Sequence, residues 1–193
     1  MSGHASAPGT AGSSRAAVPP APLGQRPYRV VFVCTGNICR SPMAEVITRS
    51  LAASTALGDG TLLGAHLEVR SAGTGPWHEG EPMHALAADA LARAGYPRHP
   101  HVAHQFSPSQ LGDIDLLVAL DRRHRQTLHG LGADPQRLAL LRAFDSSAGA
   151  AADVPDPYYG DATAFDDCRD MIAAACTGLV ASLVSHWDGL WVA

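Results

Sequence analysis

The stretch YRVVFVCTGNICRSP, residues 28–42, joins an apolar run to a glycine-containing loop and then to a helix start. Its first seven residues are mostly β-branched or apolar, which is typical of a buried central strand in a parallel sheet. Ser41 suits an N-cap and Pro42 the first helical position, while Glu45 favours the dipole at the helix start. We therefore expect a strand, a loop and a helix in succession, with the helix reaching about Ala56.

Strands and helices alternate along the rest of the chain. Apolar runs predict strands at 66–71, 115–120 and 138–141, and helices are expected at 83–94, at 121–128 and from 165 onward. In the last helix, apolar residues recur at spacings of three and four and predict a buried stripe: Phe165, Cys168, Met171, Ile172, Cys176, Leu179, Val180, Leu183, Val184 and Trp187. The alternation predicts a single α/β domain with a central four-stranded parallel sheet and helices on both faces.

Length and composition narrow the class of protein. The 193 residues suit one domain, and 46% hydrophobic with 17% charged residues is typical of a globular protein. The net charge of -4 argues against nucleic acid or an anionic membrane as the main partner. No apolar run reaches the roughly eighteen residues that span a bilayer, and no secretory signal pattern is visible. A cytoplasmic location is expected, with unconventional export left open.

The N-terminal region differs in composition from the rest. Residues 1–27 are rich in Ala, Pro, Gly and Ser, so they bury too little apolar surface to offset their ordering entropy. We expect a flexible tail over 1–27 and one domain over 28–193. The role of this tail stays open.

The four cysteines do not form a zinc or disulfide framework. Their spacing lacks the close pairs of a structural zinc site, so a reduced setting fits best: Cys34, Cys39, Cys168 and Cys176. The histidines in the stretch HPHVAH, residues 99–104, are expected to lie on a loop rather than to bind a metal. No metal or cofactor is expected.

Cys34 and Arg40, with five residues between them, predict an anion-binding loop. Backbone N–H groups of a loop this short can turn inward, and the following helix N-terminus adds positive potential. Arg40 can bind two phosphate oxygens, Gly36 allows close backbone approach, and Asn37 tolerates a left-handed conformation. Because such surroundings favour a thiolate, Cys34 is expected to attack phosphorus, with Ser41 able to donate a hydrogen bond to its sulfur.

A thiolate attacking a phosphate ester needs an acid to protonate the leaving oxygen. The strongest candidate is Asp156 in DVPDPYYGD, residues 153–161, because prolines on both sides of it stiffen an extended backbone. Asp153 and Asp161 are weaker candidates, and the same stretch is also typical of an ordinary turn. The two tyrosines that follow suit the mouth of a site that accepts an aromatic group.

Three segments, VFVCTGNICRSPMAE, SAGT and DPYYGD, together resemble the low-molecular-weight protein tyrosine phosphatases. WHEG, LVALDRRH and LRAFD make the chain similar to the actinobacterial branch of that family, over about Tyr28 to Trp187. The resemblance implies hydrolysis of phosphotyrosine through a phosphocysteine on Cys34. It also implies that Arg40 binds phosphate and that Asp156 is the general acid, then the base.

The resemblance further implies roles for residues around the loop. The loop and its support comprise Thr35, Gly36, Asn37, Ile38, Cys39, Ser41, Ser71 and His101. The walls around the phosphotyrosine ring comprise Trp77, His78, Tyr158 and Tyr159. Cys39 is implied to form a reversible disulfide with Cys34. Simpler roles stay open: Ser71 as a strand end, Trp77 as core, and Asp121 as a helix cap rather than a catalytic group.

Two other activities share parts of this pattern. Arsenate reductases use the same loop but need further cysteines in a mobile segment, whereas Cys168 and Cys176 fall on the apolar stripe of the last helix. A phosphotyrosine-binding module would call for loss of Cys34 or Asp156, and both are present. The expected partners are tyrosine-phosphorylated proteins, with a bacterial tyrosine kinase as a candidate. Nucleic acid and membrane are not expected as partners, and a monomer is expected.

Overall fold

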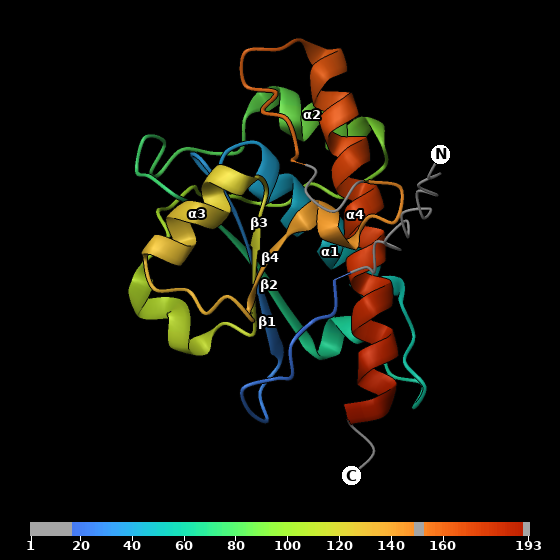
Figure 1. The fold of residues 1–193 in the computed structure, drawn as a ribbon. Helices are drawn as coiled ribbons and strands as arrows, with labels where there is room; N and C mark the ends of the chain where they lie inside the picture. The colour runs from blue at the N-terminus through green and yellow to red at the C-terminus, as the bar shows by residue number, and fades with distance from the viewer. Residues whose placement is uncertain (1–16, 149–152, 191–193) are drawn as a thin grey trace, which may run out of the picture.

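The fold is a parallel sheet covered by helices on both faces, seen in a computed structural model that describes residues 17–148 and 153–190 (Figure 1). The strands are β1 (Tyr28–Cys34), β2 (Leu67–Gly73), β3 (Leu116–Ala119) and β4 (Leu138–Leu140). The helices are α1 (Arg40–Ser54), α2 (Ala85–Arg93), α3 (Arg122–Gly130) and α4 (Ala162–Leu190), with short 3-10 helices at Leu63–Ala65, Pro108–Asp113 and Leu141–Phe144. The sheet order is β2-β1-β3-β4 and all pairings are parallel, which confirms the predicted fold class.

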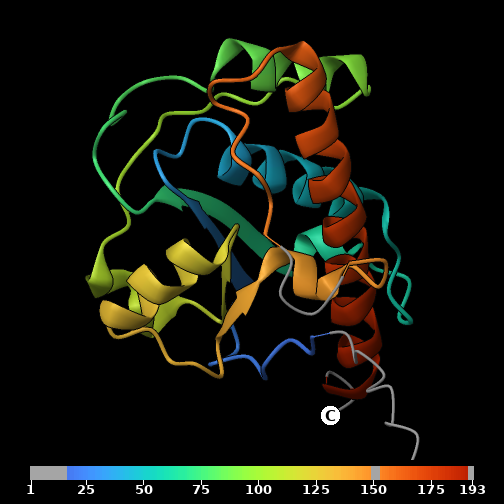
Figure 2. The same ribbon diagram turned by 45° about the horizontal axis from the view of Figure 1, so that its top comes forward.

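Strand β1 lies inside the sheet, between β2 and β3, and its two faces contact different cores. Val30 and Phe32 point toward the core that α1, α2 and α4 cover, and Val31 and Val33 point toward the smaller core under α3. Figures 1 and 2 show this arrangement, with α3 on one side of the sheet and α1 and α4 on the other. Because both faces are buried, the strand is a continuous apolar run rather than an alternating one.

Helix α4 is long and apolar, and most of its predicted stripe lies in the core: Phe165, Cys168, Ile172, Cys176, Leu179, Val180 and Leu183. The side chain of Trp187 lies outside the described ones. Within the described residues, α4 is the one helix that could cross a membrane by length and composition alone. Its stripe packs against α1, α2 and the 3-10 helix Leu141–Phe144, so it serves as the core helix of this domain.

Two predicted helix caps are wrong. Helix α1 begins at Arg40, and the Ser41 hydroxyl contacts other side chains instead of capping. Glu45 lies beyond the first turn of α1, so it has no dipole role there. For α4, the sequence favours Thr163, followed by Asp166, as the N-terminal cap, but it is Asp161 that accepts a hydrogen bond from a first-turn N–H, that of Ala164, at 3.1 Å.

Part of the region predicted as a tail lies against the domain. Residues 1–16 are outside the described residues, whereas Leu23 and Arg26 contact the sheet end opposite the carboxyl ends of the strands, and Ala17 bonds the Ala143 carbonyl beyond β4. The buried Asp115 carboxylate accepts hydrogen bonds from the Leu23 N–H at 2.6 Å and from Arg26 at 2.6 Å. The division into tail and domain stays a prediction.

Candidate active site

The loop from Cys34 to Arg40 connects the carboxyl end of β1 to the first turn of α1. Carboxyl ends of parallel strands are where α/β sheets place their ligands. Asn37 has φ 58 and is the one non-glycine with positive φ in the described part of the chain. The left-handed conformation predicted for Asn37 is therefore present, and it turns the loop back toward Cys34.

Asn37 is fully buried and connects the loop to three other segments. Its amide nitrogen donates to the hydroxyls of Ser41 at 2.9 Å and Ser71 at 3.0 Å. Its amide oxygen accepts from the backbone N–H of His104 at 3.1 Å, and its backbone carbonyl lies 2.6 Å from His101 Nε2. The predicted supporting residues are thus brought together around one side chain.

The thiol of Cys34 is buried at the bottom of the loop. Its Sγ lies 3.1 Å from the Ser41 hydroxyl, which also contacts the Ala72 carbonyl at 3.2 Å. Ser41 can therefore donate to the sulfur or to the carbonyl. Below it, the Ser71 hydroxyl donates to the buried Glu45 carboxylate at 2.7 Å.

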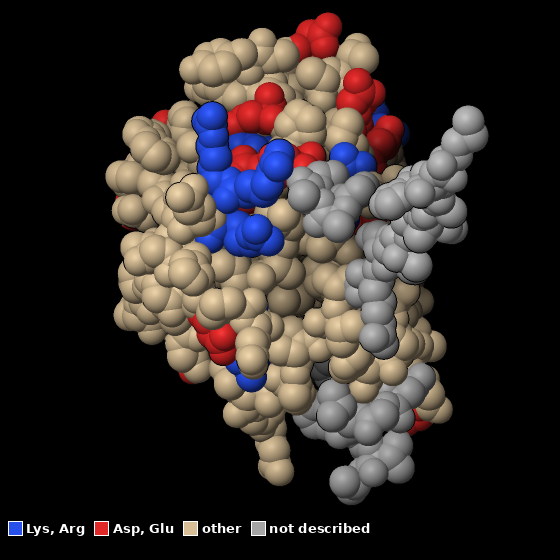
Figure 3. All heavy atoms as spheres, viewed as in Figure 1, with Lys and Arg blue, Asp and Glu red and all other residues tan. Residues whose placement is uncertain are grey.

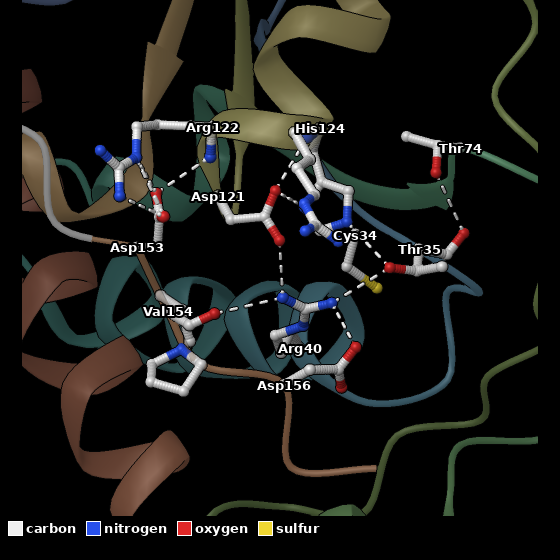
Figure 4. A network of polar contacts seen from close by, with 12 residues as sticks. Cys34, Thr35, Arg40, Thr74, Asp121, Arg122, His124, Asp153, Val154 and Asp156 are labelled. Atoms are coloured by element: carbon white, nitrogen blue, oxygen red, sulfur yellow. Dashed lines mark hydrogen bonds and ion pairs between the residues drawn. The ribbon is translucent and has the colours of Figure 1, made fainter.

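The guanidinium of Arg40 is buried and contacts four groups (Figure 4). Nη1 donates to Asp121 Oδ2 at 2.9 Å and to the Val154 carbonyl at 3.1 Å. Nη2 donates to Thr35 Oγ1 at 3.1 Å and to Asp156 Oδ2 at 2.6 Å. The predicted acid therefore lies beside the predicted phosphate-binding arginine, although 116 residues separate them in sequence.

Asp121 and His124 join Arg40 and Thr35 in a set of contacts that sequence reasoning missed. Asp121 caps α3 by accepting from the His124 N–H at 2.8 Å, as predicted, and it also holds Arg40. The imidazole of His124 reaches Thr35 Oγ1 through Nε2 at 2.9 Å, and its Nδ1 lies 3.0 Å from Asp121 Oδ1. We call Arg40, Thr35, Asp121 and His124 the Arg40 network. The sequence feature that could have indicated the Arg40 network is the segment LDRRH, residues 120–124, which follows β3.

Burial lowers the pKa of His124 to about 4, against the opposing effect of the Asp121 carboxylate. The imidazole is therefore neutral near pH 7. Since Arg40 donates to Thr35 Oγ1, the Thr35 hydroxyl is free to donate to the unprotonated Nε2 of His124. Neutral His124 thus fits its place in the Arg40 network.

The two weaker acid candidates are engaged elsewhere. Asp153 binds the Arg122 guanidinium through both carboxylate oxygens, at 3.2 and 3.0 Å from Nε. Asp161 caps α4. Asp156, whose side chain is 46% exposed, is the one of the three that lines the pocket above Cys34.

A pocket of about 270 Å³ opens above the loop. Its walls carry the predicted aromatic side chains Trp77, His78, Tyr158 and Tyr159. Tyr158 stacks at a tilt against His78, with ring centroids 5.7 Å apart, and edge-on against Tyr159 at 4.9 Å. A Cβ at Gly36 would lie 2.5 Å from His78 Cδ2, so glycine is needed there for this wall to close on the loop. Trp77 is 67% exposed and is not core.

The remaining cysteines are buried thiols. Burial raises the pKa of Cys39 well above its usual range and the pKa values of Cys168 and Cys176 to about 12. Cys168 and Cys176 lie within the packed stripe of α4, where a resolving cysteine could not move. All four cysteines are free, and the Cys34–Cys39 disulfide stays a prediction. No group of His, Cys, Asp or Glu suited to a metal occurs among the described residues.

Known proteins share this fold and loop. A family model described as low molecular weight phosphotyrosine protein phosphatase matches residues 29–187. A low molecular weight protein-tyrosine-phosphatase of Streptomyces coelicolor is 46% identical over 167 residues, which cover 84% of this chain and 97% of that relative. The low molecular weight protein-tyrosine phosphatase A of Mycobacterium bovis is 46% identical over 154 residues, covering 79% of this chain and 90% of the relative. The crystal structure of YfkJ from Bacillus subtilis aligns with a TM-score of 0.74 at 35% identity, covering 85% of this chain and 98% of that one.

The fold and the loop define an α/β enzyme whose cysteine lies in an anion-binding loop. With the extent of these matches, the chain belongs to the low molecular weight phosphotyrosine protein phosphatase family. Its similarity to the Streptomyces and Mycobacterium relatives agrees with the predicted actinobacterial branch. It is therefore a hydrolase of the protein tyrosine phosphatase class.

Proposed function

We propose that this enzyme hydrolyses phosphotyrosine in proteins through a phosphocysteine intermediate on Cys34. The observation that carries the proposal is the convergence of Cys34, Arg40 and Asp156 on one pocket with aromatic walls. A nucleophile, an anion-binding fork and a carboxyl group are the three parts that ester cleavage of this kind requires.

In the first step, the phosphoryl oxygens are bound by the loop amides and by Arg40. The phosphoryl dianion of the substrate competes with Asp156 for Arg40 Nη2, which Asp156 contacts at 2.6 Å. The carboxyl group of Asp156 is thereby released from Arg40 and can turn toward the leaving oxygen. The Cys34 thiolate attacks phosphorus, an S–P bond forms and the P–O bond to the tyrosine breaks. The proton of the Asp156 carboxyl passes to the tyrosine oxygen.

In the second step, Asp156 takes a proton from water, which attacks the phosphocysteine. The S–P bond breaks and phosphate leaves, while Cys34 departs as a thiolate. The Ser41 hydroxyl, 3.1 Å from Sγ, supports this step by donating to the sulfur. Asn37, Ser71 and His101 are proposed to keep the loop in the shape that both steps need.

Substrate choice follows from the depth and lining of the pocket. An aryl phosphate extends a flat ring between the side chains of Trp77, His78 and Tyr158 while its phosphoryl group reaches Cys34. Phosphoserine lacks this ring and would leave the aromatic walls unfilled. Tyrosine-phosphorylated proteins are therefore the proposed substrates.

Hydrolysis of a phosphotyrosine peptide and of the matched phosphoserine peptide tests the substrate class. We expect wild type to prefer the phosphotyrosine peptide by at least a hundredfold in kcat/KM and Cys34→Ser to be inactive on both. If wild type and Cys34→Ser were equally inactive but both bound the phosphotyrosine peptide, the protein would instead be a phosphotyrosine-binding module. Thiol-coupled arsenate reduction without phosphotyrosine hydrolysis would establish the reductase.

Replacement of Asp156 tests the acid. Because the acid protonates the leaving oxygen, Asp156→Ala should slow alkyl-substituted phenyl phosphates by about 10²–10⁴-fold and p-nitrophenyl phosphate far less. Asp153→Ala is the matched control and should leave this leaving-group dependence as in wild type. Equal losses with good and poor leaving groups would remove Asp156 from the role.

A further inference from the structure

A strongly basic face lies on α3, the helix that Asp121, a contact of Arg40, caps. Three of the chain's 14 basic residues, Arg122, Arg123 and Arg125, fall within four positions, although the whole chain carries a net charge of -4. Figure 3 shows basic side chains gathered near one end of α3, with acidic side chains beside them. The charge of this face is therefore opposite to that of the molecule as a whole.

The face starts directly at the active site. Asp121, which holds Arg40 at 2.9 Å, is the residue before Arg122, so the first turn of α3 forms the edge of the site. From there Arg122, Arg125 and His129 follow at helical spacing along one side of α3. They span about 10 Å at 1.5 Å per residue, which is the length of roughly three residues of extended chain.

The basic residues differ in how far carboxylates neutralise them. Arg122 is paired with Asp153 and points toward it, away from Arg40 (Figure 4). Arg123 and Arg125 are exposed, and no carboxylate of the described residues forms an ion pair with either. The carboxylate of Asp134, in the turn after α3, accepts a hydrogen bond from the backbone N–H of Gln136 at 2.9 Å. Arg125 thus keeps its charge available to a bound chain.

Arg125 also lines a hollow of about 510 Å³ at this face. The lining residues are Arg122, Arg125, Gln126, His129, Pro135 and Leu138. Basic and amide side chains on an apolar floor suit a short acidic segment, whose carboxylates need donors and whose backbone needs contact surface. The hollow gives such a segment a place along α3, whose first turn follows Asp121.

We infer that α3 is a docking surface for acidic residues that flank the phosphotyrosine of the protein substrate, with Arg125 as its main contact. This inference rests on the proposed function and specifies the substrate as an acidic phosphotyrosine segment. Binding at exposed arginines is screened by salt, so the preference for acidic flanks falls as ionic strength rises.

The test compares three phosphotyrosine peptides, with three flanking Glu, Ala or Lys residues placed on either side of the phosphotyrosine. Each kcat/KM is divided by that for p-nitrophenyl phosphate, which has no flanking residues. Wild type should have a higher ratio for the Glu peptide than for the Lys peptide when the charged residues lie on at least one side of the phosphotyrosine. In the Arg125→Glu variant, the ratio for that Glu peptide should be roughly fivefold lower than in wild type. Arg125→Lys should retain most of the preference because it keeps the charge.

Arg98→Glu is the matched control, since Arg98 is an exposed arginine beyond α2, on the other face of the sheet. It makes the same change in net charge and should leave the peptide ratios unchanged. An unchanged ratio in Arg125→Glu, or an equal loss in Arg98→Glu, would overturn the docking surface and leave the proposed function intact. Failure of wild type to hydrolyse any phosphotyrosine peptide would overturn both.

Discussion

At the residue scale, Arg40 is held in place before any phosphate arrives. Four acceptors hold the guanidinium through its two terminal nitrogens, and Asp156, whose side chain is 46% exposed, is the one proposed to give way to phosphate. The other contacts fix the plane of the fork, which lowers the ordering cost when phosphate replaces Asp156. The contacts of Arg40 to Asp121, to the Val154 carbonyl and to the Thr35 hydroxyl should therefore control catalysis by positioning Arg40.

His124 provides a test of this positioning. His124→Leu removes the acceptor for the Thr35 hydroxyl, so Arg40 loses one of its supports, and we expect kcat to fall by about tenfold with a smaller change in KM. His124→Asn keeps a polar group that can reach Thr35 and should retain most of kcat. The measurement is steady-state kinetics on p-nitrophenyl phosphate. If the Leu and Asn variants lose activity equally, His124 acts only as packing and not through Thr35.

At the element scale, the strand–loop–helix unit could be predicted from sequence because its parts are contiguous. The apolar run of β1, the spacing of Cys34 and Arg40, and the conformational tolerance of Asn37 are local properties. The Arg40 network could not be predicted, since Asp121 lies 81 residues from Arg40 and its capping role alone accounts for its residue type. Ser41 illustrates the converse: its local preference for a cap is overridden by the buried amide of Asn37.

The close approach of α4 to the 3-10 helix Leu141–Phe144 also depends on one residue. A Cβ at Gly178 would lie 1.9 Å from the Phe144 carbonyl oxygen, which is backbone and cannot rotate away. We expect Gly178→Ala to force α4 outward and to lower the free energy of unfolding by about 2–4 kcal/mol, although alanine has the higher helix propensity. Urea unfolding measures the change.

Thr177→Ala is the matched control for Gly178→Ala. Thr177 is exposed on the same turn, and its hydroxyl bonds only the Ala173 carbonyl in its own helix. Its replacement should change stability by less than about 0.5 kcal/mol. A Gly178→Ala variant as stable as wild type would mean that α4 can shift without cost at this contact.

At the scale of the whole molecule, the two ends of the sheet have different tasks. Cys34 and the pocket lie at the carboxyl ends of the strands, while at the opposite end the buried Asp115 carboxylate binds Leu23 and Arg26. Cations at both ends are arginines, because the chain has 14 basic residues and none is lysine. The planar fork suits the carboxylate pairs at Asp115, Asp121 and Asp153.

Two histidines near the loop, buried His124 and half-buried His101, couple the stability of the whole molecule to pH. Burial lowers the pKa of His124 to about 4 and also lowers the pKa of His101 below its usual value of 6.5. Between these folded values and the unfolded value, the unfolded chain binds more protons than the folded one. The contribution of His124 to stability is therefore fully present above about pH 6.5 and is lost as pH falls toward 4, at up to about 1.4 kcal/mol per pH unit, and His101 acts in the same direction.

His124→Asn isolates this effect, because asparagine does not titrate. Its free energy of unfolding should lie below that of wild type at pH 7 and fall less steeply between pH 6.5 and 4.5, so that the two curves converge on acidification. The groups that face His124 are Asp121, Asp153, Asp156 and Arg40, and they are the same in both proteins. Parallel curves for wild type and His124→Asn in urea unfolding would show that the pKa of His124 does not change on folding, and the lowered pKa assigned to buried His124 would then be wrong.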